Sequence, residues 1–396
     1  MKRNVYMIAV CVIMLLFSGG YLYAGDTTGV SEKKIKIGSN IDLTGPSSFL
    51  GRGANVAAES YFRYINDRGG INGRKIKYVI EDNQYKPVAA VAALKKLIFR
   101  DKVFGLCFSW GTVTTLAIAN DVQREKIPAL YIGGSESIFN PFRRYIFSYN
   151  TGASKMGSTV ADYIVNDMKP KVMRFACIYQ DDEMGRRGLQ GFKQAAIKHG
   201  AKWVGEEKYK RGALDFSSQV IKLKKAGANY IFLASVTREA AGILREAQKL
   251  DWHPQFFGIS ASIDKKVIEL AGAATKGYKG CTFIVGWDED IPGMVKARKT
   301  IMKYHGTLKG MSEYTNNGWV GAMLFSEGIK RAGRSLTREG LVKALESMKD
   351  FDPDGLMPPV TWGPNRREGQ IGARILKVDF EKKVPVPVTG WRIPEY

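Results

Sequence analysis

Residues 103–134, VFGLCFSWGTVTTLAIANDVQREKIPALYIGG, decide the fold because they contain one complete strand–helix–strand unit. The apolar run at 103–108 predicts a strand, the helical spacing of apolar residues over 112–126 predicts a helix, and the run at 128–133 predicts a second strand. Strands joined by a crossover helix lie parallel in one sheet. This stretch therefore indicates an α/β protein with parallel sheets.

The same unit recurs along most of the chain, which indicates two lobes of the same kind. Helical stretches separate further strands, which are expected at 34–41, 75–82, 174–180, 202–209, 230–235 and 255–260. Helices expected within 295–331 return to the first lobe, and strands expected within 373–391 rejoin the second. The predicted fold class is α/β, with two doubly wound parallel-sheet lobes.

The first 24 residues have the pattern of a secretory signal peptide. Lys2 and Arg3 precede an apolar run from 5 to 17, and small residues follow up to the expected cleavage point after Ala24. A retained membrane anchor is the alternative, but the run is shorter than the roughly 20 residues that a spanning helix needs. We therefore expect a soluble protein that is exported to the periplasm.

Cysteine usage and charge limit the possible partners. Cys107, Cys177 and Cys281 lie in apolar stretches without C-x-x-C spacing, so buried free thiols are expected. Lysine and arginine number 60 against 38 acidic residues, which gives a formal charge of +22. An excess of this size suits nucleic acid or an anionic membrane. The basic residues are scattered along helix faces, however, so no nucleic-acid partner is expected.

Motifs of catalysis and of cofactor binding are missing from the sequence. His199, His253 and His305 have no second ligand at helical spacing, which argues against a histidine metal cluster. There is no G-x-S-x-G elbow, no Walker P-loop and no G-x-G-x-x-G after the first strand. We expect no enzyme, no metal and no cofactor, and we assign the glycines of GRRGLQG (185–191) to helix packing or a loop.

The turn after the strand at 103–108 is the first candidate for ligand contact. Backbone N–H groups at Gly111 and Thr112, where a helix is expected to begin, favour an anion such as a carboxylate. Trp110 at the same edge supplies an apolar wall. Plain capping of the helix by Thr112 is the alternative.

Three further loops are expected at the same edge: IDLTGPSSFLGRG (41–53), IGGSESIF (132–139) and GISAS (258–262). They contribute six more candidate positions: Phe49, Leu50, Gly133, Gly134, Ser135 and Ser260. Each loop alone also fits an ordinary turn. Together they follow the rule that ligands of open α/β sheets bind beyond the carboxyl ends of the strands.

Five stretches carry a family resemblance: 35–98, GTVTTLAIANDVQREKIPAL (111–130), DDEMGRRGLQGFKQAA (181–196), DFSSQVIKLKKAGANYIFLA (215–234) and MPPVTWGPN (357–365). They resemble the periplasmic solute-binding proteins of branched-chain amino acid ABC transporters, the Leu/Ile/Val type with the type I periplasmic binding protein fold. The resemblance covers essentially all of the chain after residue 24. It implies two lobes that close on one small molecule and present it to a membrane permease.

The resemblance also implies how the chain is divided. Three hinge crossings are expected near Tyr149, Thr282 and Pro358. The amino-terminal lobe then comprises 33–149 plus 283–357, and the carboxyl-terminal lobe comprises 150–282 plus 358–396. A monomer is expected, because the closed protein must dock on a permease.

Residue by residue, the resemblance implies a ligand carboxylate held by Thr112 and the amide of Gly111. A ligand ammonium would meet a carbonyl and a hydroxyl at Gly133 and Ser135. Phe49 or Leu50 takes the place of an aromatic residue in the first loop.

Three departures change the expected ligand. Met184 and Val236 stand where amino acid binders have tyrosines, and Ser260 stands where they have the acidic partner of the ammonium. A buried ammonium without a counter-charge is costly. We therefore expect a carboxylate with an apolar or aromatic body rather than a standard amino acid.

Alternatives remain open at this stage. Asp181, Asp182 or Glu136 could supply the missing counter-charge, which would restore an amino acid ligand. Amide and urea-type ligands are also bound in the broad family that the chain resembles. A soluble periplasmic sensor of such a ligand is the alternative to a transport protein.

Overall fold

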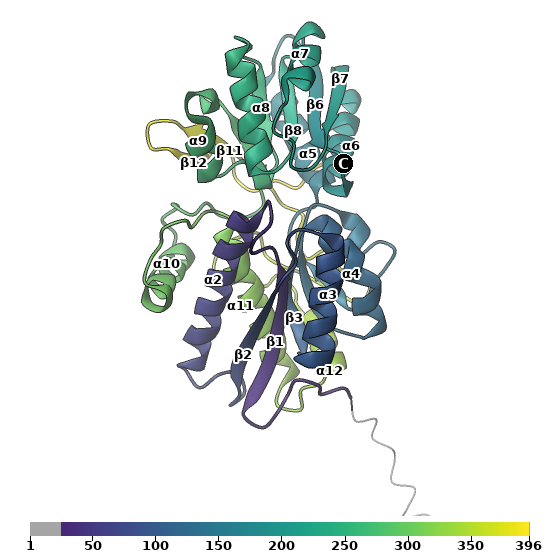
Figure 1. Cartoon of the computed structure of the whole chain (residues 1–396), viewed down its shortest axis with the longest axis vertical. Helices are drawn as coiled ribbons and strands as arrows, with labels where there is room; N and C mark the ends of the chain where they lie inside the picture. Colours follow the sequence, from purple (N-terminus) through teal and green to yellow (C-terminus); the bar gives the residue numbers. More distant parts are fainter. Residues whose placement is uncertain (1–24, 396) are drawn as a thin grey trace, which may run out of the picture.

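The computed structural model describes residues 25–395 as two lobes, one above the other in Figure 1, each built on a central sheet. The predicted signal peptide, residues 1–24, lies outside the described residues. Between residues 25 and 395, no helix is long and apolar enough to cross a membrane. Cys107, Cys177 and Cys281 are buried and free, as predicted.

The first sheet has five parallel strands in the order β2-β1-β3-β4-β5. Their bounds are β1 (Lys34–Ile41), β2 (Lys75–Asp82), β3 (Gly105–Trp110), β4 (Ala129–Ile132) and β5 (Ile146–Ser148). Every residue of β3 and β4 is buried, as is usual for central parallel strands covered by helices on both faces.

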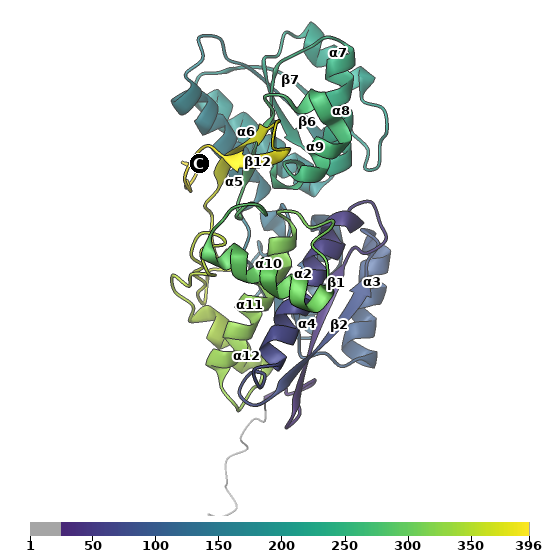
Figure 2. The same cartoon turned by 90° about the vertical axis from the view of Figure 1, so that its left-hand side faces the viewer.

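Helices from two distant parts of the chain cover this sheet. They are α2 (Ser48–Asn66), α3 (Pro87–Lys95) and α4 (Thr112–Arg124), followed much later by α10 (Pro292–His305), α11 (Thr315–Ala332) and α12 (Arg338–Glu346). Helix α11 packs against α2, β3 and α12, and Figure 2 shows α10 and α11 beside α2 in the lower lobe, with α12 next to α11. Burial along almost the whole of α11 makes it the centre of the lobe.

The second sheet has seven strands in the order β12-β11-β10-β9-β8-β6-β7. Their bounds are β6 (Arg174–Gln180), β7 (Lys202–Tyr209), β8 (Tyr230–Ala234), β9 (Gln255–Gly258), β10 (Lys279–Thr282), β11 (Arg374–Asp379) and β12 (Val384–Pro387). Strands β6 to β10 run parallel, and β11 and β12 join antiparallel. Pro385 and Pro387 in the edge strand limit further strand pairing there.

The helices of this lobe are α5 (Ala153–Tyr163), α6 (Glu183–Lys198), α7 (Ser217–Lys225), α8 (Thr237–Lys249) and α9 (Lys265–Ala271). The chain leaves the first sheet after β5, returns after β10, and passes to the second sheet again between α12 and β11. The protein is therefore two doubly wound α/β lobes joined by three crossings.

The start of α2 differs from the sequence expectation, which placed Phe49 and Leu50 in a loop. The helix begins at Ser48, so both residues lie in its first turn. Asp42 arranges the preceding turn, because its carboxylate accepts from the amides of Gly45 and Ser47 and from the Ser47 hydroxyl at 2.7 Å. Gly51 allows the helix to approach the Asp42 carbonyl closely. Gly51 is thus a packing requirement of this helix.

Glycines also hold α5 and α6 together, as one of the two sequence interpretations of GRRGLQG proposed. Gly185, Gly188 and Gly191 are buried in α6. A Cβ on Gly191 would lie 1.9 Å from the carbonyl oxygen of Ser154 in α5. The two helices therefore approach each other closely only because position 191 has no side chain.

We predict that Gly191→Ala lowers the free energy of unfolding by about 1–3 kcal/mol, because the methyl group must push α5 and α6 apart. This loss exceeds the gain of about 1 kcal/mol that alanine has over glycine in a helix. Urea denaturation measures the difference. Gly390→Ala is the control, since a Cβ there meets no atom within 4 Å. An unchanged stability in Gly191→Ala would contradict the packing argument.

Candidate functional site

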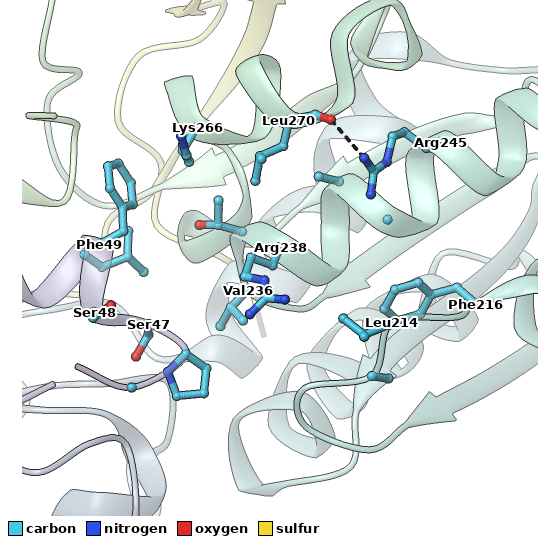
Figure 3. A pocket seen from close by; sticks show the side chains of 17 residues that line it. Ser47, Ser48, Phe49, Leu214, Phe216, Val236, Arg238, Arg245, Lys266 and Leu270 are labelled. Atoms are coloured by element: carbon cyan, nitrogen blue, oxygen red, sulfur yellow. Dashed lines mark hydrogen bonds between the residues drawn. The ribbon is translucent and has the colours of Figure 1, made fainter. Parts of the chain in front are cut away.

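A cavity of about 460 Å³ lies between the two lobes. One wall comes from the turn before α2 and its first residues, and the other from the loop before α7 and from α8 and α9. Figure 3 shows Ser48 and Phe49 of the first lobe facing Val236 and Arg238 of the second. The apolar side chains that line it are Phe49, Leu50, Leu214, Phe216, Val236 and Leu270. The cavity therefore offers an apolar environment that both lobes complete.

Cationic side chains surround this apolar cavity. Arg238, Arg245 and Lys266 belong to its lining, and among the described residues that line it there is no Asp or Glu. Lys266 pairs with Glu269 at 2.6 Å, whereas Arg245 donates to the backbone carbonyl of Leu270 at 3.4 Å. The electrostatic environment of the cavity consequently favours an anionic ligand group.

Trp110 is the last residue of β3, and its side chain contacts Ser47 and Tyr314 from two other parts of the first lobe. Its indole Nε1 donates to the Ser47 hydroxyl at 3.2 Å, and its ring packs edge-on against Tyr314 with centroids 4.7 Å apart. The Ser260 hydroxyl of the second lobe lies close enough to oppose the rise in the pKa of Tyr314 that burial causes. Tyr314 therefore lies against Trp110 and close to Ser260 of the second lobe.

Gly111 and Thr112 begin α4, as predicted, but the alternative of capping by Thr112 is wrong. Gly111 is the N-cap residue, with a positive φ of 91° that favours glycine, and no side chain caps the helix. The Thr112 hydroxyl instead accepts from the amide of Gly134 at 2.8 Å. Thr112 thus joins the ends of β3 and β4.

Gly133 and Ser135 are already engaged within the protein. Both backbone groups of Gly133 bond to the Asn150 side chain, and the Ser135 hydroxyl accepts from the amide of Ser137. The Ser135 hydroxyl also donates to Glu183 of the second lobe at 3.1 Å. These two residues therefore hold the loop and the lobes in place in this structure.

Met184 and Val236 reach the cleft from the second lobe. Both are buried, and Met184 lies so close to Gly134 that a Cβ there would be 2.5 Å from the Met184 Cγ. Val236 directly precedes α8 and lines the cavity. Of the eleven residues named from the sequence, Phe49, Leu50 and Val236 line the cavity. The other eight lie at the ends of strands, in the loops after them or at the starts of the helices that follow.

The acidic residues considered as counter-charges differ in availability. Asp181 pairs with Lys208 and Arg186, and Asp182 caps α6 and pairs with Arg211. Glu136 uses one carboxylate oxygen to accept from Ser154, while within residues 25–395 its other oxygen has no partner. Glu136 is therefore the one of the three with hydrogen-bonding capacity to spare.

Sequence reasoning missed a second acidic residue, Glu313, which directly precedes Tyr314. Its side chain is buried, and in the described part of the chain neither carboxylate oxygen has a hydrogen-bond partner. Burial, followed by the nearby Asp264 of the second lobe, raises the pKa of Glu313 to about 8. Burial likewise raises the pKa of Asp264 to about 6. Nothing in the sequence marks Glu313, because it follows no strand and belongs to no motif.

Comparison with known proteins gives this cleft a family context. A family model described as "Periplasmic binding protein" matches residues 34–383. The chain belongs to the periplasmic binding protein family. Its members bind substrates and are not enzymes, which agrees with the expectation of binding without catalysis.

Individual relatives share modest identity. The "Amino acid binding protein" of Pseudomonas aeruginosa is 28% identical over 254 residues, which is 64% of this chain and 65% of that protein. The "Leucine-specific-binding protein" of Salmonella typhimurium is 24% identical over 91% of this chain and 93% of its own length. The recognised resemblance to Leu/Ile/Val-binding proteins is thereby confirmed.

Solved structures share the fold. A fatty acid ABC transporter substrate-binding protein from Thermomonospora curvata superposes with a TM-score of 0.85 at 24% identity, over 93% of this chain and 95% of that one. A branched-chain amino acid ABC transporter protein from Thermus thermophilus with bound valine gives 0.84 at 24% identity, over 92% and 98%. Both confirm the fold class.

We predict that Thr112→Val lowers the free energy of unfolding by about 1–3 kcal/mol, because the buried Gly134 amide loses its acceptor. Ligand affinity should fall with it, because the turn that Gly134 belongs to is no longer fixed. Urea denaturation and calorimetric titration measure the two effects. Thr112→Ser keeps the hydroxyl and should retain both properties. A Ser variant as impaired as the Val variant would contradict the assignment of these effects to the hydroxyl.

The raised pKa of Glu313 predicts a pH-dependent stability. Folded Glu313 holds its proton up to about pH 8, whereas the unfolded chain releases it near the ordinary value of 4.5. Between these values the folded state binds more protons, so the free energy of unfolding falls as the pH rises. Glu313→Gln should therefore gain stability relative to the unmodified protein from about pH 5 to pH 8 and keep that gain above pH 8.

Urea denaturation at about pH 5, 7 and 9 tests this expectation. Glu269→Gln is the control, because this carboxylate is exposed. If the difference between Glu313→Gln and the unmodified protein is the same at all three pH values, Glu313 does not titrate as described.

Proposed function

We propose that this chain is the extracytoplasmic substrate-binding subunit of an ABC importer. It captures a small carboxylate with an apolar or aromatic body between its lobes, in the periplasm, and delivers it to a membrane permease. The observation that carries the ligand class is the interlobe cavity of about 460 Å³, whose walls are apolar and whose charged lining residues are all cations.

The chemistry of the cavity supports a carboxylate in two ways. The apolar body of the ligand loses its contact with water when both lobes cover it, which is worth about 25 cal/mol per Å² of apolar surface. The carboxylate stays near Arg238, Arg245 and Lys266, where the positive potential stabilises it. Two proteins of the same fold are described with a fatty acid and with bound valine. Both compounds combine a carboxylate with an apolar body, and valine also carries an ammonium group.

An amino acid ligand is the second candidate, and Glu136 and Glu313 favour it. Each has at least one carboxylate oxygen without a partner among the described residues, and the Glu313 side chain is almost fully buried. An ammonium group close to such a carboxylate would be stabilised by it. The two candidates therefore differ in a single group of the ligand.

Matched ligand pairs separate the two candidates. The protein is unfolded and refolded to remove bound ligand, and its melting point is then measured with leucine against 4-methylpentanoate and with phenylalanine against 3-phenylpropionate. A ligand that binds only the folded state raises the melting point. We expect the deaminated acids to give the larger rise. A rise with the amino acids alone would establish the second candidate instead.

A double variant tests the contribution of the cationic residues in the cavity lining to ligand binding. Arg238→Gln combined with Arg245→Gln should weaken binding of the preferred carboxylate by about 0.2–1 kcal/mol for each charge, since both side chains are solvent-exposed. The control is Lys171→Gln with Lys309→Gln, which removes the same charge from residues outside the cavity lining. Equal losses in both double variants would assign the effect to net charge rather than to the cavity.

A further inference from the structure

A cluster of buried polar side chains lies at the carboxyl ends of three adjacent strands of the second lobe. Gln180 ends β6 and stands opposite Tyr209, which ends the neighbouring strand β7. Ser235 follows β8 on the other side of β6. Arg211 and Glu239 belong to the turn after β7 and to the first turn of α8. We call these five residues the strand-end cluster.

The strand-end cluster has unused hydrogen-bonding capacity. Within residues 25–395, five of its buried atoms have no partner at hydrogen-bond geometry: Gln180 Oε1, Tyr209 Oη, Arg211 Nε, Ser235 Oγ and Glu239 Oε2. The Ser235 hydroxyl nevertheless lies close enough to Tyr209, and the Gln180 side chain close enough to Tyr85, to oppose the rise in pKa that burial causes in each tyrosine. Buried polar atoms are normally bonded, and each exception destabilises the fold. Five exceptions in one place indicate a site that a polar group from outside the chain fills.

Other contacts hold the cluster in place without using these atoms. The Arg211 guanidinium pairs with Asp182 at 3.3 Å and lies over the Tyr85 ring of the first lobe, 4.8 Å from its centroid. The other oxygen of Glu239 accepts from the Gly212 amide at 3.3 Å. The free atoms therefore belong to side chains whose positions are already fixed, which is what a preorganised binding site requires.

The cluster lies between the two regions of the cleft described above. Tyr85 packs beside Gly111, because a Cβ at Gly111 would be 2.7 Å from the Tyr85 ring. On the other side, the Tyr209 ring packs edge-on against Phe216 of the cavity lining, with centroids 5.3 Å apart. Ser235 directly precedes Val236 of the same lining. The strand-end cluster therefore lies directly behind Phe216 and Val236 of the cavity lining.

The free atoms suit an uncharged group. The charge of Arg211 is balanced by Asp182, so the cluster needs no further ion. Arg211 Nε donates, Gln180 Oε1 accepts, and the hydroxyls of Tyr209 and Ser235 can do either. Burial raises the pKa of Glu239, which favours its neutral form. A hydroxyl group both donates and accepts, and so matches this set.

We propose that the strand-end cluster is a second subsite of the cleft that receives a hydroxyl group of the ligand. The ligand is then a hydroxyl-bearing apolar or aromatic carboxylate. This inference rests on the proposed function, because it assigns a further group to the same ligand.

Calorimetric titration of the refolded protein tests the subsite with four compounds: 3-phenylpropionate and its analogues with a hydroxyl at ring position 2, 3 or 4. One hydroxylated isomer should bind at least about tenfold more tightly than the parent acid. Equal affinities for all four would overturn the subsite and leave the proposed function intact. Failure of all four to bind would overturn the aromatic carboxylate and, with it, the subsite.

Two variants test whether the strand-end cluster causes the preference for the hydroxylated isomer. In Tyr209→Phe and in Ser235→Ala, the preference for the hydroxylated isomer should shrink by about tenfold, while the affinity for 3-phenylpropionate stays unchanged. Tyr278→Phe is the matched control, because this buried tyrosine of the same lobe donates to the Ser262 carbonyl and lies outside the cluster. A preference that survives in both cluster variants would place the hydroxyl elsewhere and overturn the assignment.

Stability of the ligand-free variants gives an independent readout. Tyr209→Phe removes a hydroxyl that has no partner among the described residues, so its melting point should equal or exceed that of the unmodified protein. A clearly lower melting point would show that the Tyr209 hydroxyl is bonded within the protein and is not available to a ligand.

Discussion

Both lobes direct the carboxyl ends of their parallel strands into one shared gap, and the chemistry of the protein depends on this constraint. Strand ends of the first sheet supply Trp110 and the Gly133 turn, and strand ends of the second supply Gln180, Tyr209 and Val236. Parallel sheets leave helix amino termini and turn backbone groups at these ends. Because the sheets face each other, the polar groups at the strand ends of both sheets lie around one cleft.

Polar contacts across the gap hold the lobes together in this structure. Glu183 of α6 accepts from the hydroxyls of Ser135 and Ser137, at 3.1 Å and 2.6 Å, and Arg187 pairs with Glu183 at 2.9 Å. Hydrogen bonding by Ser137, Arg187 and Ser135 keeps the pKa of Glu183 below its ordinary value, although burial opposes this. At Glu183 the polar groups of the two lobes are hydrogen-bonded to each other. In the strand-end cluster and at Glu313, by contrast, buried polar atoms of the described residues have no partner in the facing lobe.

Much of the fold could be predicted from the sequence, but only part of the site. The strands at 34–41, 75–82, 174–180 and 202–209 have the predicted bounds, because short β-rich runs between turn residues are a local signal. The start of α2 was wrong because the Asp42 turn and the close approach of Gly51 are tertiary effects. Strand-end loops could be named from topology alone. Glu313, Tyr85 and Arg211 could not, because only the folded arrangement brings them to the cleft.

Charge explains why the family resemblance alone does not give the ligand. The resemblance implies that Ser260 stands in place of an acidic counter-charge, whereas the structure brings Glu313 close to the same region through Tyr314. A carboxyl group that stays protonated near neutral pH does not attract a cation as an ionised one does. A bound ammonium would have to ionise Glu313 against the cost of burial and the repulsion of Asp264. A carboxylate without an ammonium would avoid that cost, and the cationic cavity lining would stabilise it. These terms support the proposal of a deaminated ligand.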